Sequence, residues 1–315
     1  MPWITRNGAH LFIGEDGSPV NPNSGNFRAM LNTRSGTAEK GTAVYNKNTK
    51  TWTDSSGNPL PEHLQNIKIP PAWENVQYSK DGNNNLLVTG KDGKGRSQAI
   101  YSEKFTQQNA DAKFARISEL DKNFSTIKSE VNSDISSRRK IEEASAARLV
   151  MATGIRPGGD KDTGAEKQAY GATTLLGGHV VGNSPENTRL QFVGKKGVNL
   201  DIPVSDKTVA SDLLSRRETA GADGRLFKTD ASKLSEYVHE KDGGGFKTKD
   251  FRTLIGTRTA IDEVSKMKIP STKKEYEKSV RSVAKVVSVK LGNTPTVALQ
   301  SYISPVVFAN WKVRN

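Results

Sequence analysis

The chain contains no cysteine and few histidines, and these absences remove several kinds of chemistry. Without cysteine there is no disulfide framework, no thiolate nucleophile and no sulfur ligand for a metal. The histidines at positions 10, 63, 179 and 239 are scattered, with no pair at helical or zinc-ligand spacing. A Gly-x-x-x-x-Gly-Lys-Ser/Thr phosphate loop is also missing from the sequence. We therefore expect chemistry that uses neither a metal nor a nucleotide cofactor.

Long apolar runs are missing as well. The N-terminus reads Met-Pro-Trp-Ile-Thr-Arg-Asn-Gly, which lacks the apolar stretch of a signal peptide. No segment approaches the length that crosses a membrane. We expect a soluble, intracellular protein with no membrane partner.

Basic residues are abundant. The 315 residues carry a formal net charge of +13, and the sequence pI is about 9.7. A broad positive potential favours a polyanionic partner and makes association sensitive to salt, so nucleic acid is the leading candidate. The length exceeds that of one typical domain and favours two compact units.

The order of sequence patterns predicts an α+β protein. Residues 1–41, rich in glycine, asparagine, serine and threonine, are expected to be an appendage of unknown role. Residues 42–105 contain short β segments at 43–53, 76–78, 86–89 and 98–101, which predict a small antiparallel β domain. Residues 106–315 are expected to form a mainly helical domain.

Within that domain, apolar residues recur every three or four positions from Phe114 to Ile135, which is typical of an amphipathic helix. We expect further helices over about 140–151, ending near Gly154, and from a cap at Ser271 to Gly292. The segments 190–193 and 198–204 flank Gly-Lys-Lys-Gly and predict a β-hairpin with a lysine at its turn.

A set of basic residues precedes a tyrosine near the C-terminus, and the combination suits chemistry on a phosphodiester. Tyr302 is the candidate nucleophile, because breaking the ester without a metal requires one. Arg156 and Arg252 can clamp the phosphate, since a guanidinium offers a fork of N–H donors and stays charged. Lys195 is the candidate general acid for the departing oxygen, with Lys196 as its competitor. Asn293 can donate a hydrogen bond to a non-bridging oxygen.

These residues and their surroundings resemble the type IB DNA topoisomerases, in the poxviral and bacterial branch. The resemblance runs from about residue 42 to 308 and includes three further segments, Ile-Pro-Pro-Ala-Trp-Glu-Asn-Val at 69–76, Thr-Gly-Lys-Asp-Gly-Lys-Gly-Arg-Ser-Gln at 89–98 and Ala-Tyr-Gly-Ala-Thr-Thr-Leu-Leu-Gly-Gly-His-Val at 169–180. Residues 1–41 match nothing in the family core.

The resemblance implies a tyrosine-recombinase-like catalytic domain with a small β-hairpin sheet, preceded by a β domain that clamps DNA. It implies that Tyr302 attacks DNA and forms a 3′-phosphotyrosyl link, with Arg156, Arg252 and Asn293 activating the phosphate and Lys195 as the acid. The strand then rotates and is religated, which relaxes supercoils without ATP or metal. Some branches have histidine at the position of Asn293, so we expect hydrogen bonding there rather than charge.

The same resemblance implies duplex DNA as the partner of a monomer in the cytoplasm of a bacterium or a virus-infected cell, or in a virion. Candidate DNA contacts are Lys91, Lys94, Arg96, Trp73 and Lys249. For the three residues of the Lys91–Arg96 loop, simple solubilisation is an equal alternative. Trp73 is also interpreted as a hydrophobic anchor.

Two alternative functions stay open. A tyrosine recombinase or integrase would use the same covalent chemistry, although such enzymes usually carry histidine at the position of Lys249. A non-catalytic DNA-binding virion protein could keep the fold after losing activity.

Overall fold

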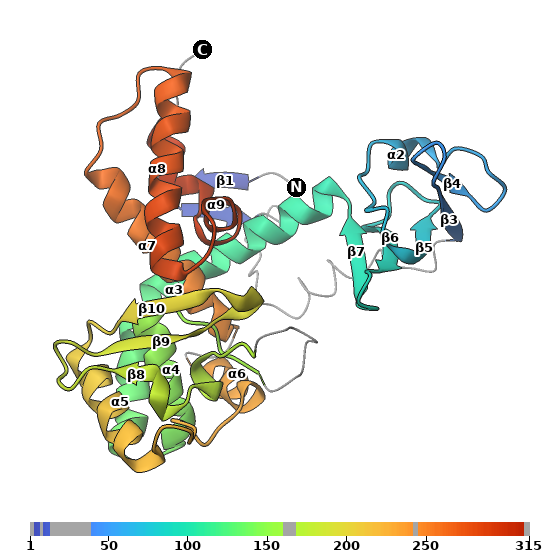
Figure 1. Ribbon diagram of the computed structural model, residues 1–315. Coiled ribbons are helices and arrows are strands. Elements are labelled where there is room, and N and C mark those ends of the chain that lie inside the picture. The colour runs from blue at the N-terminus through green and yellow to red at the C-terminus, as the bar shows by residue number, and fades with distance from the viewer. Residues whose placement is uncertain (1–2, 7–8, 13–38, 160–167, 242–244, 312–315) are drawn as a thin grey trace. The chain divides into compact units, whose positions relative to one another are not determined.

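A computed structural model describes residues 3–6, 9–12, 39–159, 168–241 and 245–311 (Figure 1). The chain divides into two compact units, Met1–Ala115 and Arg116–Asn315. Most of the predicted appendage at 1–41 lies outside the described residues. None of the described helices is long and apolar enough to cross a membrane.

The first unit is built on antiparallel strands. Its strands are β1 (Trp3–Arg6), β2 (Ala9–Phe12), β3 (Lys40–Asn46), β4 (Thr51–Asp54), β5 (Glu74–Ser79), β6 (Leu86–Lys91) and β7 (Ser97–Tyr101). β1 and β2 form a two-stranded hairpin, and the other strands form a five-stranded sheet in the order β4-β3-β5-β6-β7. The short helix α2 (Glu62–Gln65) packs Leu64 into the core of this sheet. The small antiparallel β domain expected from the sequence is therefore confirmed.

One expected segment of this sheet has a different form. The single β segment expected at 43–53 is a hairpin of β3 and β4, in which Ala43 pairs with Asp54 and Asn46 with Thr51. The turn is closed by the side chain of Asn46, whose Oδ1 accepts hydrogen bonds from the amides of Asn48 (2.9 Å) and Thr49 (3.2 Å). Asparagine favours such turns because its side chain can bond to nearby backbone.

The second unit is mainly helical. It contains the second half of α3 (Glu103–Ser136), then α4 (Ile141–Thr153), α5 (Lys207–Ala220), α6 (Ala231–His239), α7 (Thr248–Ser265), α8 (Lys273–Leu291) and α9 (Pro295–Tyr302). A three-stranded sheet in the order β10-β9-β8 is made by β8 (Val180–Val181), β9 (Arg189–Val193) and β10 (Asn199–Pro203). Short 3₁₀ turns are η1 (Ala172–Thr174), η2 (Gly177–His179), η3 (Lys195–Gly197) and η5 (Pro305–Trp311). The α+β class is confirmed.

Local sequence signals set several helix ends. α4 and α8 stop at Gly154 (φ 69°) and Gly292 (φ 56°), as predicted, because glycine adopts the left-handed conformation without steric cost. The N-terminal cap of α8 is Thr272 rather than the expected Ser271. The hydroxyl of Thr272 accepts the amide of Glu275 (3.2 Å), while the hydroxyl of Ser271 donates to the carboxylate of Glu275 (2.7 Å).

The helical unit has two apolar cores. The larger gathers α3, α4, α5, α6, the start of α7 and the three-stranded sheet, with Leu149, Leu213 and Phe251 among its fully buried side chains. The smaller lies between α7, α8, α9 and η5, and includes Val287, Leu291 and Ala298. Tyr302 borders the smaller core.

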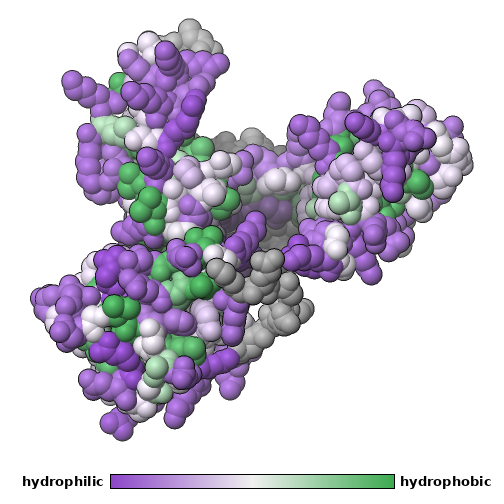
Figure 2. Space-filling view, viewed as in Figure 1, coloured by the Kyte–Doolittle hydropathy of each residue, from purple (hydrophilic) through white to green (hydrophobic). Residues whose placement is uncertain are grey.

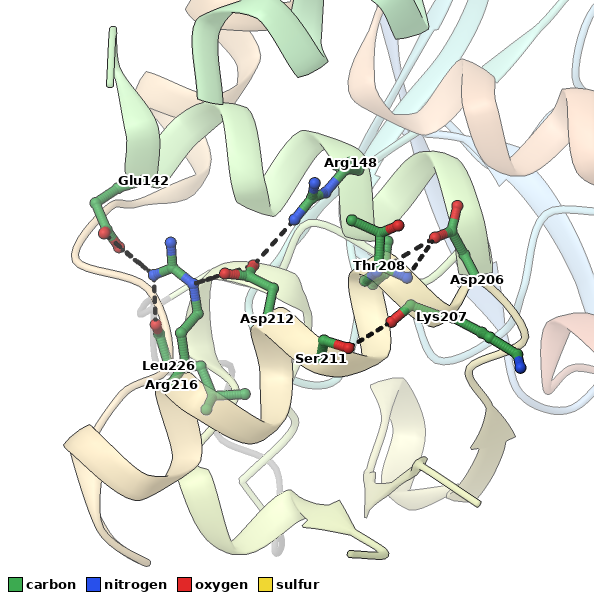
Figure 3. A network of polar contacts seen from close by, with 10 residues as sticks. Glu142, Arg148, Asp206, Lys207, Thr208, Ser211, Asp212, Arg216 and Leu226 are labelled. Carbon is green, nitrogen blue, oxygen red and sulfur yellow. Dashed lines mark hydrogen bonds and ion pairs between the residues drawn. The ribbon is translucent and has the colours of Figure 1, made fainter. Parts of the chain in front are cut away.

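An ionic network fastens α5 to α4 (Figure 3). The guanidinium of Arg216 donates to both carboxylate oxygens of Glu142 (3.1 and 2.9 Å), to Asp212 (3.2 Å) and to the carbonyl of Leu226 (3.0 Å). Asp212 also lies 3.5 Å from the guanidinium of Arg148, which is buried on α4. Because α4 ends six residues after Arg148, at Gly154, the network fixes the helix that leads into Arg156.

Candidate active site

Tyr302 is the last residue of the short helix α9. The helix begins at Thr294, whose hydroxyl accepts the amide of Val297 (3.3 Å), and has Pro295 at its first position. Proline is favourable there because its missing N–H has no partner in a first turn. The side chain of Tyr302 is half-buried.

Helix α7 holds the backbone of Tyr302. The hydroxyl of Thr257 donates to the carbonyl of Tyr302 (3.2 Å) and accepts the amide of Ser304 (3.2 Å). One residue earlier, Gly256 lets the chain approach closely, because a Cβ at that position would lie 2.6 Å from the carbonyl oxygen of Tyr302. The tyrosine is therefore fixed on the side of α7 that also carries Arg252, one helical turn away.

Arg252 is buried between the ends of two helices. Its Nη1 donates to the carbonyl of Gly154 (2.7 Å), which ends α4, and its Nη2 donates to the carbonyl of Leu291, which ends α8. These carbonyls have no partner within their own helices, so the guanidinium satisfies them. The guanidinium carbon lies 4.9 Å from the centre of the Tyr302 ring.

Arg156 follows the glycine that ends α4. Its backbone is held by the amide of Ala172, which donates to the carbonyl of Arg156 (2.8 Å). The segment after Arg156 and the segment before Ala172 approach closely at Gly158 and Gly171. A Cβ on Gly171 would lie 2.5 Å from the amide nitrogen of Gly158. The side chain of Arg156 hydrogen-bonds to Tyr302.

The two guanidinium groups change the acidity of the phenol. Burial acts to raise the pKa of Tyr302, but the charges of Arg252 and Arg156, together with hydrogen bonds from both, outweigh it and lower the pKa below its ordinary value. Burial, aided by the charge of Arg156, lowers the pKa of Arg252 to about 10. A phenol that ionises more easily is a better nucleophile at a given pH.

Asn293 stands beside this cluster with an unused side chain. It follows Gly292 at the end of α8, and its amide donates to the carbonyl of Ser288 (3.0 Å). Both polar atoms of its side chain are buried, and neither has a hydrogen-bond partner among the described residues. A buried amide without partners is costly, so this one is suited to a ligand.

Lys195 lies at the tip of the β9–β10 hairpin, as the sequence predicted. Leu200 packs against Gly194 within this hairpin and against Gly292 at the end of α8. A Cβ on Gly194 would lie 2.6 Å from one methyl of Leu200, and a Cβ on Gly292 would lie 2.1 Å from the other. Since Gly194 precedes Lys195 and Gly292 precedes Asn293, Leu200 brings the hairpin turn to the end of α8.

The structure thus brings Tyr302, Arg156 and Arg252 into direct contact. Asn293 lies two residues after Leu291, whose carbonyl accepts a hydrogen bond from Arg252. Lys195 is exposed, and its ammonium makes no hydrogen bond or ion pair within the described residues. Lys196 is also exposed and has a positive φ of 65°. The structure therefore places the hairpin of Lys195 against the end of α8 through Leu200, whereas its ammonium touches none of the other three side chains within the described residues.

At the start of α7, the adjacent residues Lys249 and Asp250 differ in exposure to solvent. Lys249 is exposed, whereas Asp250 is fully buried and accepts two hydrogen bonds from Arg116 (2.7 and 3.0 Å). Asp250 also accepts the amide of Lys247 (2.9 Å) at the start of the helix. The pair of Asp250 with Arg116 anchors α3 to the helix that carries Arg252.

In the first unit, Lys91, Lys94 and Arg96 are all exposed around the turn between β6 and β7. Asp92 organises this turn: it accepts the side chain of Arg96 (2.8 Å) and the amides of Lys94 (3.0 Å) and Arg96 (3.1 Å). The hydrogen bond from Arg96 is the main cause that lowers the pKa of Asp92 to about 2. Trp73 is half-buried and packs against the core of the sheet.

The two histidines nearest these elements have structural partners. His179 accepts the amide of Leu176 on Nδ1 (3.0 Å), and its ring lies 4.4 Å from that of Tyr170. Burial lowers the pKa of His179. Nδ1 of His239 lies 3.1 Å from the carbonyl of Phe246. Within the described parts of the chain, no group of three or more metal-binding side chains gathers.

Residues 102–306 match the family described as eukaryotic DNA topoisomerase I, catalytic core. The chain belongs to this family, the type IB DNA topoisomerases, and is an enzyme of the isomerase class whose substrate is DNA. It is similar to the DNA topoisomerase 1B of Acanthamoeba polyphaga mimivirus, at 26% identity over 263 residues, or 77% of each chain. It is also 26% identical to the DNA topoisomerase 1 of Rabbit fibroma virus (strain Kasza), over 79% of this chain and 81% of the relative. The family expected from the sequence is confirmed.

Several residues that shape the site were not found from the sequence. Gly256 and Thr257 follow Arg252 by four and five residues, but no spacing rule shows that they face Tyr302. The Thr-Pro pair after Asn293 did carry a signal, since threonine followed by proline is typical of a helix start.

Proposed function

We propose that Tyr302 is the nucleophile of a reversible transesterification on DNA. The phenol loses its proton, its oxygen attacks the phosphorus, and a bond forms between Tyr302 and the 3′ phosphate. The bond from phosphorus to the 5′ oxygen breaks, and that oxygen takes up a proton. The reverse reaction reseals the strand after rotation has changed the linking of the duplex. The observation that carries the proposal is the contact of the Tyr302 phenol with two guanidinium groups that lower its pKa.

Each cation has a role that follows from its position. Arg156 and Arg252 would neutralise the negative charge that grows on the non-bridging oxygens in the transition state. Arg252 is suited to this because its backbone partners at Gly154 and Leu291 fix it in place before substrate arrives. Asn293 would donate its side-chain N–H to one of these oxygens, which would give its buried amide a partner.

Lys195 would protonate the departing 5′ oxygen. Two observations support this role: its side chain is exposed at the hairpin tip, and the contact of Leu200 with Gly292 keeps the hairpin next to Asn293. One ester is exchanged for another of similar energy, so the proposed reaction needs neither ATP nor a metal.

The nucleophile is tested by covalent capture. Tyr302→Phe should abolish the adduct with a nicked suicide duplex while leaving salt-sensitive DNA binding largely intact, because only one hydroxyl is removed. Relaxation of positively and negatively supercoiled plasmid in EDTA without ATP should proceed with the unaltered enzyme. An adduct formed by Tyr302→Phe, or a requirement for a divalent metal, would reject the proposal.

The acid is tested by changing the leaving group. Lys195→Ala should slow cleavage far more with a normal 5′ oxygen than with a 5′ sulfur, which needs less protonation to depart. Lys196→Ala, which removes the neighbouring cation, should slow both substrates little. Equal slowing of both substrates by Lys195→Ala would mean that another group is the acid.

The remaining roles are also part of the proposal. The β unit would contact duplex DNA through Lys91, Lys94, Arg96 and Trp73, with Lys249 on the other unit, so that a monomer clamps the duplex. The enzyme would work in the cytoplasm of a bacterium or a virus-infected cell, with a virion as the alternative. Sedimentation of the protein with and without a duplex tests the monomer, since a second copy in the DNA complex would contradict it.

A further inference from the structure

The outward surface of α8 carries four cations in one line. Lys274, Lys278, Arg281 and Lys285 are separated by four, three and four residues, and all are exposed. Residues with this spacing share one face of a helix. The other side of α8 packs Val283, Val287 and Leu291 into the smaller core of the unit. Figure 2 shows mainly hydrophilic residues, with some apolar ones among them, on the visible surface of the α7–α8 pair. We call the four cations the α8 basic face.

Most of the positive charge on this face is not paired with a carboxylate. Arg281 pairs with Glu277 (3.0 Å), but within the described chain the side chains of Lys274, Lys278 and Lys285 form no ion pair. Many other exposed cations of this unit do have carboxylate partners: Lys122 with Glu119, Lys140 with Glu240, Lys207 with Glu186, and Lys266 with Asp262 and Glu263. Other exposed lysines of the unit, such as Lys233 and Lys249, also form no ion pair within the described residues, so the α8 basic face is distinguished by the alignment of its cations along one helix.

Apart from the pair of Glu277 with Arg281, the arrangement does not stabilise the helix itself. Like charges three and four residues apart repel one another and destabilise a helix. The line contains such neighbours at each step from Lys274 to Lys285. An external polyanion would relieve this repulsion.

The spacing suits a nucleic-acid backbone. The helix rises by about 16 Å over the eleven steps from Lys274 to Lys285. One strand of a duplex carries a phosphate for about every 3.4 Å of helix axis, so this length spans about five phosphates. Four cations along it can each approach a phosphate.

The helix that carries this face also ends at the candidate active site. α8 ends at Leu291, whose carbonyl accepts a hydrogen bond from Arg252, and Asn293 follows two residues later. We propose that the α8 basic face binds the sugar-phosphate backbone of duplex DNA as a contact surface additional to the groups around Tyr302. This inference rests on the proposed function only in taking DNA as the substrate.

The experiment is the salt dependence of DNA binding, measured by fluorescence anisotropy with a 40-bp duplex. All proteins would carry Tyr302→Phe, so that only non-covalent binding is measured. The test variant replaces the four cations with glutamine (Lys274→Gln, Lys278→Gln, Arg281→Gln and Lys285→Gln). The slope of log Kd against log salt should fall by about 3 to 4, because each lost phosphate contact removes about 0.9.

A matched control removes the same amount of charge elsewhere. It carries Lys122→Gln, Lys140→Gln, Lys207→Gln and Lys266→Gln, all exposed lysines with carboxylate partners in the same unit. Its slope should change by less than about 1, since these lysines contact no phosphate. Equal slopes for the two variants would show a general effect of net charge and overturn the proposal.

A second measurement needs no substitution and so does not depend on folding of the variant. Lysines of the unaltered protein are acetylated with and without the duplex and quantified by mass spectrometry. Lys278 and Lys285 should be protected by DNA several-fold more than Lys207. Equal modification would overturn the proposal, as would binding of anionic phospholipid vesicles that depends on these lysines while DNA leaves them unprotected. Covalent capture at low salt reports on Tyr302 separately, so its loss would count against the proposed mechanism and not against this surface.

Discussion

The hydroxyl of Thr257 bridges the chain on both sides of Ile303: it donates to the carbonyl of Tyr302 and accepts the amide of Ser304, each at 3.2 Å. Thr257 lies on α7 five residues after Arg252, whose guanidinium faces the ring of Tyr302. One helix therefore fixes both the backbone of the tyrosine and the cation that contacts its ring. Thr257 is a positioning residue in this arrangement, since it does not reach the phenol.

Thr257→Val keeps the shape of the side chain and removes both hydrogen bonds. We expect the cleavage rate in a single turnover to fall about 10-fold, because a net hydrogen bond contributes about 1 kcal/mol and the tyrosine would lose its alignment. DNA affinity should be unchanged. Thr257→Ser, which keeps the hydroxyl, should restore most of the rate. A loss of rate in both variants, or a loss of affinity in Thr257→Val, would contradict positioning through the hydroxyl.

Gly292→Ala tests whether the packing of Leu200 places Lys195. A Cβ at Gly292 would lie 2.1 Å from a methyl of Leu200, so the hairpin must move. We expect slower cleavage of a normal 5′ oxygen substrate, by up to about 100-fold, and a smaller loss with a 5′ sulfur leaving group. Gly221→Ala is the control, because Gly221 also follows a helix with positive φ (69°) but has no neighbour within 4 Å of the added Cβ. Equal slowing by both variants would point to backbone strain alone.

Arg156→Gln should raise the pKa of Tyr302. The charge and the hydrogen bond of Arg156 both lower this pKa, so their loss leaves burial less opposed. Phenolate forms as pH rises through the pKa, so the ultraviolet absorbance of tyrosinate should appear at higher pH in the variant. The signal of Tyr302 is isolated by subtracting the titration of Tyr302→Phe. Lys196→Gln removes an exposed cation of the β9–β10 turn as a control, and an equal shift in that variant would contradict a specific effect of Arg156.

Asp250→Asn should destabilise the helical unit. Asp250 is fully buried and binds Arg116 through two hydrogen bonds, so its neutralisation leaves a half-buried guanidinium without its counter-charge. Breaking one partner of such a pair costs about 3 to 5 kcal/mol in free energy of unfolding, which urea denaturation measures. Asp262→Asn, which affects an exposed pair with Lys266, should cost less than about 1 kcal/mol. Similar losses in the two variants would contradict a structural role for the buried pair.

Features with a local cause were predictable from the sequence. The left-handed glycines that end α4 and α8, the period of α3 and the hairpin that presents Lys195 all follow from nearby residues. The prediction of a single strand at 43–53 was wrong, because the turn depends on the side chain of Asn46 alone, within a run of β-forming residues. The cap of α8 was misplaced by one residue, since Ser271 and Thr272 both bond to Glu275.

Features that depend on distant contacts could not be predicted. Helices α5 and α6 have local caps, since the side chains of Asp206 and Asp230 accept hydrogen bonds from amides of the first turn. The apolar faces of these helices, however, are buried only when the core is assembled. The pair of Arg116 with Asp250 joins residues far apart in the chain. The bonds of Arg252 to two helix ends and the isolated amide of Asn293 likewise exist only when α4, α7 and α8 are packed together.

The attachment of Tyr302 to α7 determines which part of the protein would carry mechanical load. If the tyrosine holds a broken strand, torque stored in the DNA is transmitted through its main chain to Thr257 and the buried side of α7. That helix is anchored at its start by the Asp250–Arg116 pair. A tether of this kind would let the free strand swivel while the joined strand stays within reach for resealing.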